Sequence, residues 1–260
     1  MATSADPRTV LTREAPAPSG TTSYGPDPAQ LYDVRLPTSA PRGSTVVVIH
    51  GGFWQAEYDR AHAASQAQAF ADNGFHVAVL EYRRVGMAGG GWPGTFQDVM
   101  AAVSAVRADP ELPDRVVLVG HSAGGHLAAL VASQPDAHGL GGAVSLAGCV
   151  DLMLTARMGL GDRAAQSLMG GEPADLPAEY GEADPAALTP AVPLLLLHGA
   201  DDRIVPPEVS RSYEDCVARS GRQHAEVRLT VIPACEHFGL IDPEHPAFAV
   251  VLEAVRTLAP

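Results

Sequence analysis

The sequence predicts an α/β fold in which a mostly parallel central sheet carries helices on both of its faces. Short apolar runs alternate along the chain with longer segments of helical periodicity, as in successive β-α-β units. The 260 residues, 46% of them hydrophobic, are enough to bury one substantial core. No internal repeat is evident, so the alternation itself indicates the fold class.

The elements can be predicted in chain order. The strands are expected at 31–36, 45–50, 76–82, 115–120, 142–146, 194–198 and 226–232. The helices are expected at 61–73, 93–108, 123–133, 206–220 and 244–258. Residues 45–50 (TVVVIH) are mostly β-branched, which is typical of a strand buried on both faces. Gly74, Pro110 and Gly221 mark where three of the helices end.

The chain divides into a leader and one domain. Residues 1–25 are rich in Pro, Ser, Thr and Ala, which predicts a flexible leader that is loose or lies along the surface. Residues 26–260 are expected to form a single domain. Residues 151–189 show no strand signal and are long for a connection, so they predict a small helical, cap-like insertion over the sheet. Neither a secretory signal nor an apolar run of membrane-spanning length is present, and we expect a cytoplasmic protein.

Charge and composition exclude several function classes. The formal net charge is −13, with 30 acidic and 17 basic residues and no basic cluster, which argues against nucleic-acid and anionic-membrane partners. All the basic residues are Arg, so lysine chemistry is unavailable. Cys149, Cys216 and Cys235 have no metal-site spacing. We expect a small-molecule substrate, no metal and no organic cofactor; the oligomeric state is not predicted.

The strongest signal is Gly120-His121-Ser122-Ala123-Gly124, which fits G-x-S-x-G between a predicted strand and a predicted helix. The chain must reverse sharply there, and side chains at either glycine would collide with neighbouring elements. Ser122 is thereby lifted above the carboxyl edge of the sheet, beside helical N–H groups that favour negative charge. We interpret Ser122 as a nucleophile; the alternative is an ordinary glycine-rich turn.

A serine hydroxyl needs a base, and the expected chain order is Ser, acid, His. Asp201 and Asp202 follow the strand 194–198, and His237 follows the last strand, so all lie at carboxyl ends of strands. The other histidines considered as the base precede the last strand, start a helix or lie in a loop: His224, His245 and His138. A Cys235 nucleophile is disfavoured, because near neighbours in sequence rarely face each other.

An oxyanion loop is predicted at His50-Gly51-Gly52-Phe53-Trp54, directly after a strand. The expected donors are the N–H groups of Gly52, Phe53 and Ala123, each worth roughly 3–4 kcal/mol of barrier. The remaining histidines near these motifs are interpreted as structural: His50, His121, His126 and His198. The predicted substrate pocket is formed by Trp54, Tyr58, Trp92 and Met153, with Met158 and Met169 as further candidates. For the methionines, core packing is an equal alternative.

These motifs together make the chain resemble the α/β-hydrolase superfamily over nearly its whole length. HGGFW, GHSAGGHLA, HGADDRIVP and Glu236-His237 occur in the family order. The resemblance to H-G-x-x-D-x-x-V-P selects Asp202 as the acid, with Asp201 capping the turn, and implies a Ser122–His237–Asp202 triad. HGGFW with Tyr82-Arg83 and GHSAGGH resembles kynurenine formamidase (arylformamidase) more narrowly, although related carboxylesterases and prolyl-oligopeptidase-like hydrolases carry similar loops. Phe53 replaces the third glycine of the HGGG esterases.

The expected function is therefore a serine hydrolase that cleaves an ester or amide bond, such as an aryl formamide, through an acyl-enzyme. Two alternatives stay open. An acyltransferase or peptidase would use the same fold and the same triad. A binding protein on a hydrolase scaffold would catalyse no reaction.

Overall fold

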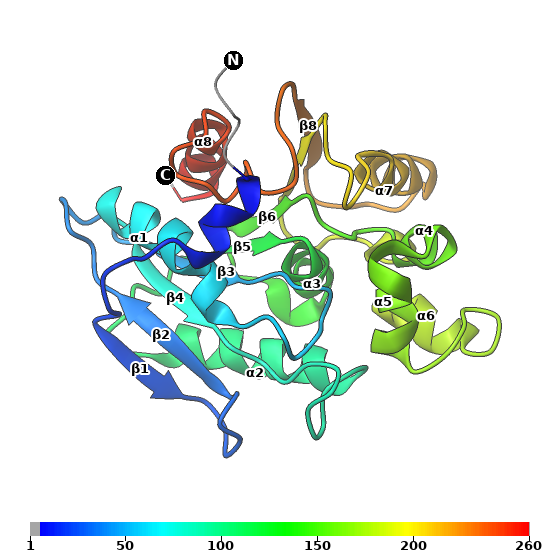
Figure 1. Ribbon diagram of the computed structural model, residues 1–260, viewed down its shortest axis with the longest axis horizontal. Helices are drawn as coiled ribbons and strands as arrows, with labels where there is room; N and C mark the ends of the chain where they lie inside the picture. Colours follow the sequence, from blue (N-terminus) through cyan, green and yellow to red (C-terminus); the bar gives the residue numbers. More distant parts are fainter. Residues whose placement is uncertain (1–5, 260) are drawn as a thin grey trace.

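The computed structural model describes residues 6–259, in which eight strands form one sheet in the order β1-β2-β4-β3-β5-β6-β7-β8 (Figure 1). The strands are β1 Gly20–Ser23, β2 Leu31–Arg35, β3 Thr45–Ile49, β4 His76–Leu80, β5 Val116–His121, β6 Gly142–Leu146, β7 Leu194–Gly199 and β8 Val227–Ile232. β2 pairs antiparallel with both β1 and β4, and every other neighbouring pair is parallel. The predicted mostly parallel sheet is confirmed.

Helices cover both faces of the sheet, as predicted. On one face lie α1 (Ala64–Asp72), preceded by the 3-10 helix η2 (Arg60–Ala63), and α8 (Phe248–Leu258). The other face carries α2 (Gly94–Ala108), α3 (Ala123–Ala132) and α7 (Glu208–Arg219). A short 3-10 helix, η3 (Pro135–Ala137), follows α3.

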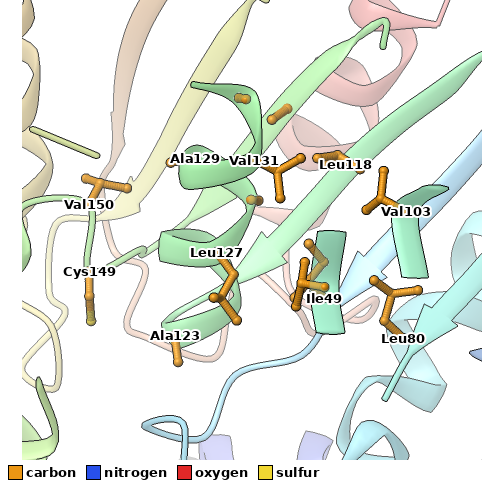
Figure 2. Close-up of a cluster of buried hydrophobic side chains, with 14 of the residues drawn as sticks. Ile49, Leu80, Val103, Leu118, Ala123, Leu127, Ala129, Val131, Cys149 and Val150 are labelled. Carbon is orange, nitrogen blue, oxygen red and sulfur yellow. The ribbon is translucent and has the colours of Figure 1, made fainter. Parts of the chain in front are cut away.

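Alternation along β3 explains the two cores. Val46 and Val48 pack with α1 and α8, whereas Val47 and Ile49 pack on the opposite face. Figure 2 shows Ile49 beside Leu118 and Leu127 in the second of these clusters. Because β3 is buried on both faces, its sequence is a continuous apolar run rather than an alternating one.

The strand connections change direction near the centre of the sheet. From β3 the chain passes through α1 to β4 on one side, and then through α2 to β5 on the other side of β3. The order therefore reverses between β3 and β5, and ligands of open α/β sheets bind beyond the carboxyl ends of the strands at such a point. The loop that begins at His50 and the turn at Ser122 both lie at this edge.

The segment 151–189 is helical, as expected. It contains α4 (Leu152–Met158), α5 (Leu160–Met169), α6 (Pro177–Ala183) and the 3-10 helix η4 (Pro185–Ala187), and Figure 1 shows α4, α5 and α6 grouped together near α7. Gly161 packs against the ring of Phe53, since a Cβ at this glycine would lie 2.2 Å from that side chain. The insertion therefore contacts the predicted oxyanion loop, and its role as a cap stays a prediction.

The predicted leader (1–25) includes regular secondary structure among its described residues. Residues 1–5, like residue 260, lie outside the described residues, but Pro7–Thr12 form the 3-10 helix η1 and Gly20–Ser23 form β1. Val10 is buried, and the Arg13 guanidinium forms an ion pair with Asp242. Polar and proline-rich composition does not reveal these contacts because each is made with another segment of the chain; Asp242, for example, lies 229 residues after Arg13. The mobility of this segment stays a prediction.

In residues 6–259, no helix combines the length and the apolar character that crossing a bilayer requires.

Candidate active site

The turn from β5 into α3 holds Ser122 in a strained conformation, with φ 55° and ψ −118°. A Cβ at Gly120 would lie 2.0 Å from the Gly124 carbonyl oxygen, and one at Gly124 would lie 2.0 Å from the Ile49 carbonyl oxygen. Both glycines are therefore required for the close approach that the turn makes. The Ser122 N–H donates to the Leu146 carbonyl at 2.8 Å, which ties the turn to β6. The geometry is that of a nucleophile elbow.

Asp202 and His237, which follow β7 and β8, meet at this edge of the sheet. The His237 Nδ1–H donates to Asp202 Oδ2 over 2.6 Å, and both residues are buried. Asp202 Oδ1 accepts from the N–H groups of Ile204 and Val205 at 2.8 and 2.9 Å. Asp201, in contrast, is exposed, and its N–H donates to the backbone carbonyl of Cys235. The structure thus pairs the histidine with Asp202.

The electrostatics keep Asp202 ionised. Burial by itself would raise its pKa, but the hydrogen bonds with His198 and His237 and that from the Val205 amide outweigh burial and hold the pKa well below its usual value. An ionised carboxylate fixes His237 with its proton on Nδ1, and the other ring nitrogen, Nε2, is then available to accept a proton.

Ser122 and His237 both line one cavity of about 250 Å³. Its other lining residues are Arg8, Leu11, His50, Gly51, Gly52, Phe53, Tyr58, His62, Ala63, Gln66, His121, Ile204, Phe238 and Ile241. Within residues 6–259, Ser122 Oγ makes no hydrogen bond. The hydrogen bond between a catalytic serine hydroxyl and its histidine is often long in a substrate-free site and shortens when the substrate binds.

The predicted oxyanion donors have no hydrogen-bond acceptor among the described residues. The N–H groups of Gly52, Phe53 and Ala123 make no hydrogen bond within the described part of the chain. Phe53 and Trp54 both have positive φ, 53° and 58°, so the loop turns tightly after Gly52. Gly52 and Phe53 line the cavity beside Ser122, while Ala123 opens α3, whose N-terminus favours negative charge.

A buried network holds the start of this loop, and sequence analysis did not identify it. The Tyr82 hydroxyl donates to the His50 carbonyl at 2.7 Å, and its ring stacks on the His50 imidazole. His50 Nδ1–H donates to the Gly51 carbonyl at 2.8 Å, and Arg84 contacts Nε2. Burial, followed by the Arg84 charge, lowers the pKa of His50 to about 3, so the ring is neutral. The Tyr82-Arg83 pair in the sequence was the one available signal.

The other histidines near the motifs also have structural partners. His121 Nε2 hydrogen-bonds the backbone carbonyl of His237 at 3.0 Å, and His126 Nε2 bonds that of Ala183 at 2.7 Å. Burial lowers the pKa of His121 to about 3 and that of His126 to about 4. His198 bonds Ser210 and the Val205 carbonyl, behind Asp202.

The predicted pocket residues lie in different places relative to this cavity. Tyr58 lies on the cavity wall, but Trp54, Trp92 and Met153 do not line this cavity. Trp54 is fully buried and packs edge-on against His126, because the turn at Phe53 directs the next side chain into the core. Trp92 and Met153 pack against the same core cluster. Apolar character predicts burial, but only the path of the loop decides between core and cavity.

The cysteine alternative receives no support from the geometry. Cys235 is fully buried and absent from the cavity lining, and burial raises the pKa of its thiol to about 12. No group of His, Cys, Asp and Glu suited to a metal ion occurs among the residues that the structure describes.

Solved structures with the same architecture are esterases of the α/β-hydrolase fold. A truncated carbohydrate esterase from gut microbiota superposes with a TM-score of 0.75, 20% identity and coverage of 94% of this chain and 97% of that one. Esterase B from Lactobacillus rhamnosis superposes with a TM-score of 0.74, 22% identity and coverage of 97% and 89%. At these identities the likeness establishes the fold.

A family model, BD-FAE, matches residues 32–216, more than half of the chain. The chain belongs to the BD-FAE family. The BD-FAE match includes Ser122 and Asp202 and ends before His237.

Among curated proteins, the chain is 27% identical to the esterase LipQ of Mycobacterium tuberculosis, over 82% of this chain and 55% of that protein. It is 28% identical to isoprenylcysteine alpha-carbonyl methylesterase ICME of Arabidopsis thaliana, over 79% and 56%. This BD-FAE chain spans about half the length of these relatives.

Proposed function

We propose that the chain is a carboxylic-ester hydrolase in which Ser122, His237 and Asp202 form the catalytic triad. The observation that carries this proposal is one cavity lined by the strained Ser122, by His237 of a buried His–Asp pair, and by Gly52 and Phe53. The N–H groups of Gly52 and Phe53, and that of Ala123 next to Ser122, have no hydrogen-bond partner among the described residues. Membership of the BD-FAE family and the named activities of LipQ and the methylesterase support ester hydrolysis.

The geometry accounts for each step of the reaction. Ser122 Oγ attacks the acyl carbon while its proton passes to His237 Nε2, and the imidazolium formed is stabilised by Asp202. The carbonyl oxygen becomes an oxyanion that accepts from the N–H groups of Gly52, Phe53 and Ala123. The carbon–oxygen bond to the alcohol then breaks, and the alcohol leaves with the proton from His237.

The acyl-enzyme is resolved by water in the same way. His237 takes a proton from the attacking water, the new tetrahedral carbon collapses, and the bond to Ser122 Oγ breaks as the serine regains its proton. The free acid is the product. An added alcohol or amine in place of water would make the reaction an acyl transfer, so product analysis separates the two.

The test is hydrolysis of 4-nitrophenyl acetate, with N-formyl-L-kynurenine as a second substrate. We expect Ser122→Ala to fold like the wild type and to lose at least about 10³-fold in kcat/KM. A clear preference of the wild type for the formamide would extend the proposal to aryl formamides. Undiminished turnover by Ser122→Ala would overturn it, and an inactive wild type that no serine-directed phosphonate labels would favour a binding protein.

A further inference from the structure

One cavity side chain has no partner that would explain its burial. Gln66, on α1, is 2% exposed and lines the cavity that contains Ser122. Its Nε2 is buried with no hydrogen-bond partner, and its Oε1 likewise makes no hydrogen bond within residues 6–259. Several other residues have buried, unpartnered side-chain atoms, but none of those residues lines this cavity.

An unpaired carboxamide is costly to bury. A polar group that loses water without gaining a partner destabilises the folded state. A leucine or methionine of similar size would fill the same position on α1 without that cost. Ala67, Phe70 and Ala71, three of the other four buried residues of α1, are apolar, and the fourth, Ser65, has a much smaller polar group than the amide of Gln66.

The surroundings indicate what the amide is suited to bind. Tyr58 and His62 line the same cavity, with their rings 5.5 Å apart, and neither side chain makes a hydrogen bond within the described residues. Burial lowers the pKa of His62, so at neutral pH its ring is uncharged. A neutral imidazole, a phenol and a carboxamide each offer both a donor and an acceptor. These three side chains therefore suit a neutral group that also donates and accepts.

We propose that Gln66 is a specificity-determining residue whose carboxamide binds a hydroxyl group of the substrate close to the scissile ester. The inference rests on the proposed ester hydrolysis and adds a substrate class to it. A hydroxyl satisfies the amide in either orientation, because it donates to the carbonyl oxygen or accepts from the NH₂ group. The hydroxyl can belong to the acid or to the alcohol of the ester.

Two pairs of nearly isosteric esters test this inference and distinguish the two sides. The acid pair is 4-nitrophenyl 3-hydroxybutanoate against 4-nitrophenyl 3-methylbutanoate, and the alcohol pair is 2-hydroxypropyl butanoate against 2-methylpropyl butanoate. In each pair a hydroxyl replaces a methyl group. The ratio of kcat/KM within a pair is compared between the wild type, Gln66→Leu and Gln66→Met, so that intrinsic reactivity cancels. Gln97→Leu, the same change at an exposed position of α2, is the control.

We expect the preference for the hydroxyl ester to fall about tenfold in one pair for both Gln66 variants, chiefly through KM, and to stay unchanged in Gln97→Leu. The melting temperature of Gln66→Leu should rise by about 2–4 °C, because an unpaired buried amide is removed. A structural role for Gln66 would instead lower the melting temperature and reduce the hydrolysis of both esters equally.

Unchanged ratios in both pairs, with Ser122-dependent hydrolysis intact, would overturn the inference and leave the proposed function standing. A lower melting temperature with an equal loss on both esters would also overturn it. A wild type without any Ser122-dependent hydrolysis would overturn the proposed function and this inference with it.

Discussion

Asp202 joins two loops that are distant in the sequence. One oxygen accepts from two backbone N–H groups of its own loop, and the other accepts from His237 at 2.6 Å. The carboxylate therefore both shapes its loop and fixes which nitrogen of His237 carries the proton. Asp201, its exposed neighbour, offers a matched comparison because it has the same side chain without these contacts.

Asp202→Asn is expected to lower kcat by about 10⁴-fold while the fold is kept. An asparagine oxygen can still accept from Ile204 and Val205, but the amide donates to His237 Nδ1 and leaves the proton on Nε2, where it blocks the base. Steady-state hydrolysis of 4-nitrophenyl acetate measures the loss, and Asp201→Asn is the control with little change. Activity of Asp202→Asn within threefold of the wild type would contradict the assigned triad.

At the scale of the element, the loop that begins at His50 after β3 is held by the side chain of Tyr82, which follows β4. The Tyr82 hydroxyl donates to the His50 carbonyl, and the N–H groups of Gly52 and Phe53 make no hydrogen bond within residues 6–259. Oxyanion stabilisation requires donors fixed to within a fraction of an ångström. The hydroxyl of Tyr82 is thus a positioning group, although it does not line the cavity.

Tyr82→Phe is expected to reduce kcat about tenfold with a smaller effect on KM, because the oxyanion donors act in the transition state. The buried His50 carbonyl also loses a partner, which costs roughly 1–3 kcal/mol of unfolding free energy. Tyr32→Phe is the control: it removes the 2.7 Å hydrogen bond that Tyr32, on β2, donates to Asp109 at the end of α2. Kinetics and urea unfolding are measured for both variants, and equal kcat values would refute the positioning role.

At the scale of the whole molecule, the buried histidines give stability a pH dependence. His50, His121 and His126 are buried, and burial lowers their pKa values to about 3, 3 and 4. In the unfolded chain a histidine has a pKa of about 6.5, so below that pH the unfolded state binds protons that the folded state does not. The contribution of these histidines to the free energy of unfolding is fully present above pH 6.5 and is lost as the pH falls below that value. Asp184, whose pKa burial raises to about 6, acts in the opposite direction.

The unfolding free energy should therefore decrease between pH 7.5 and pH 5, by about 2 kcal/mol for each of these histidines at pH 5. His126→Gln is expected to reduce the pH dependence by one such contribution, because its amide still donates to the Ala183 carbonyl without taking up a proton. Urea unfolding at the two pH values measures this difference. An equal pH dependence in wild type and variant would show that His126 is protonated in the folded state.

The sequence by itself determined the parts of this protein that depend on local pattern. The β-branched run of β3, the G-x-S-x-G elbow and the loop positions of His237 and the aspartates follow from strand, turn and helix signals within a few residues. The sheet and the serine turn were therefore predictable. The edge strand β1 was not, because Gly20–Ser23 is short, exposed and defined by pairing with β2.

Only the tertiary structure decided which side chains meet. It brought Asp202, which the resemblance had already favoured over Asp201, into contact with His237, turned Trp54 into the core and left Tyr58 on the cavity wall. It also brought η1 to the cavity and left Gln66 unpartnered beside Ser122. The physical reason is that local sequence sets backbone conformation and burial, whereas hydrogen-bond partners and cavity walls come from segments distant in the chain.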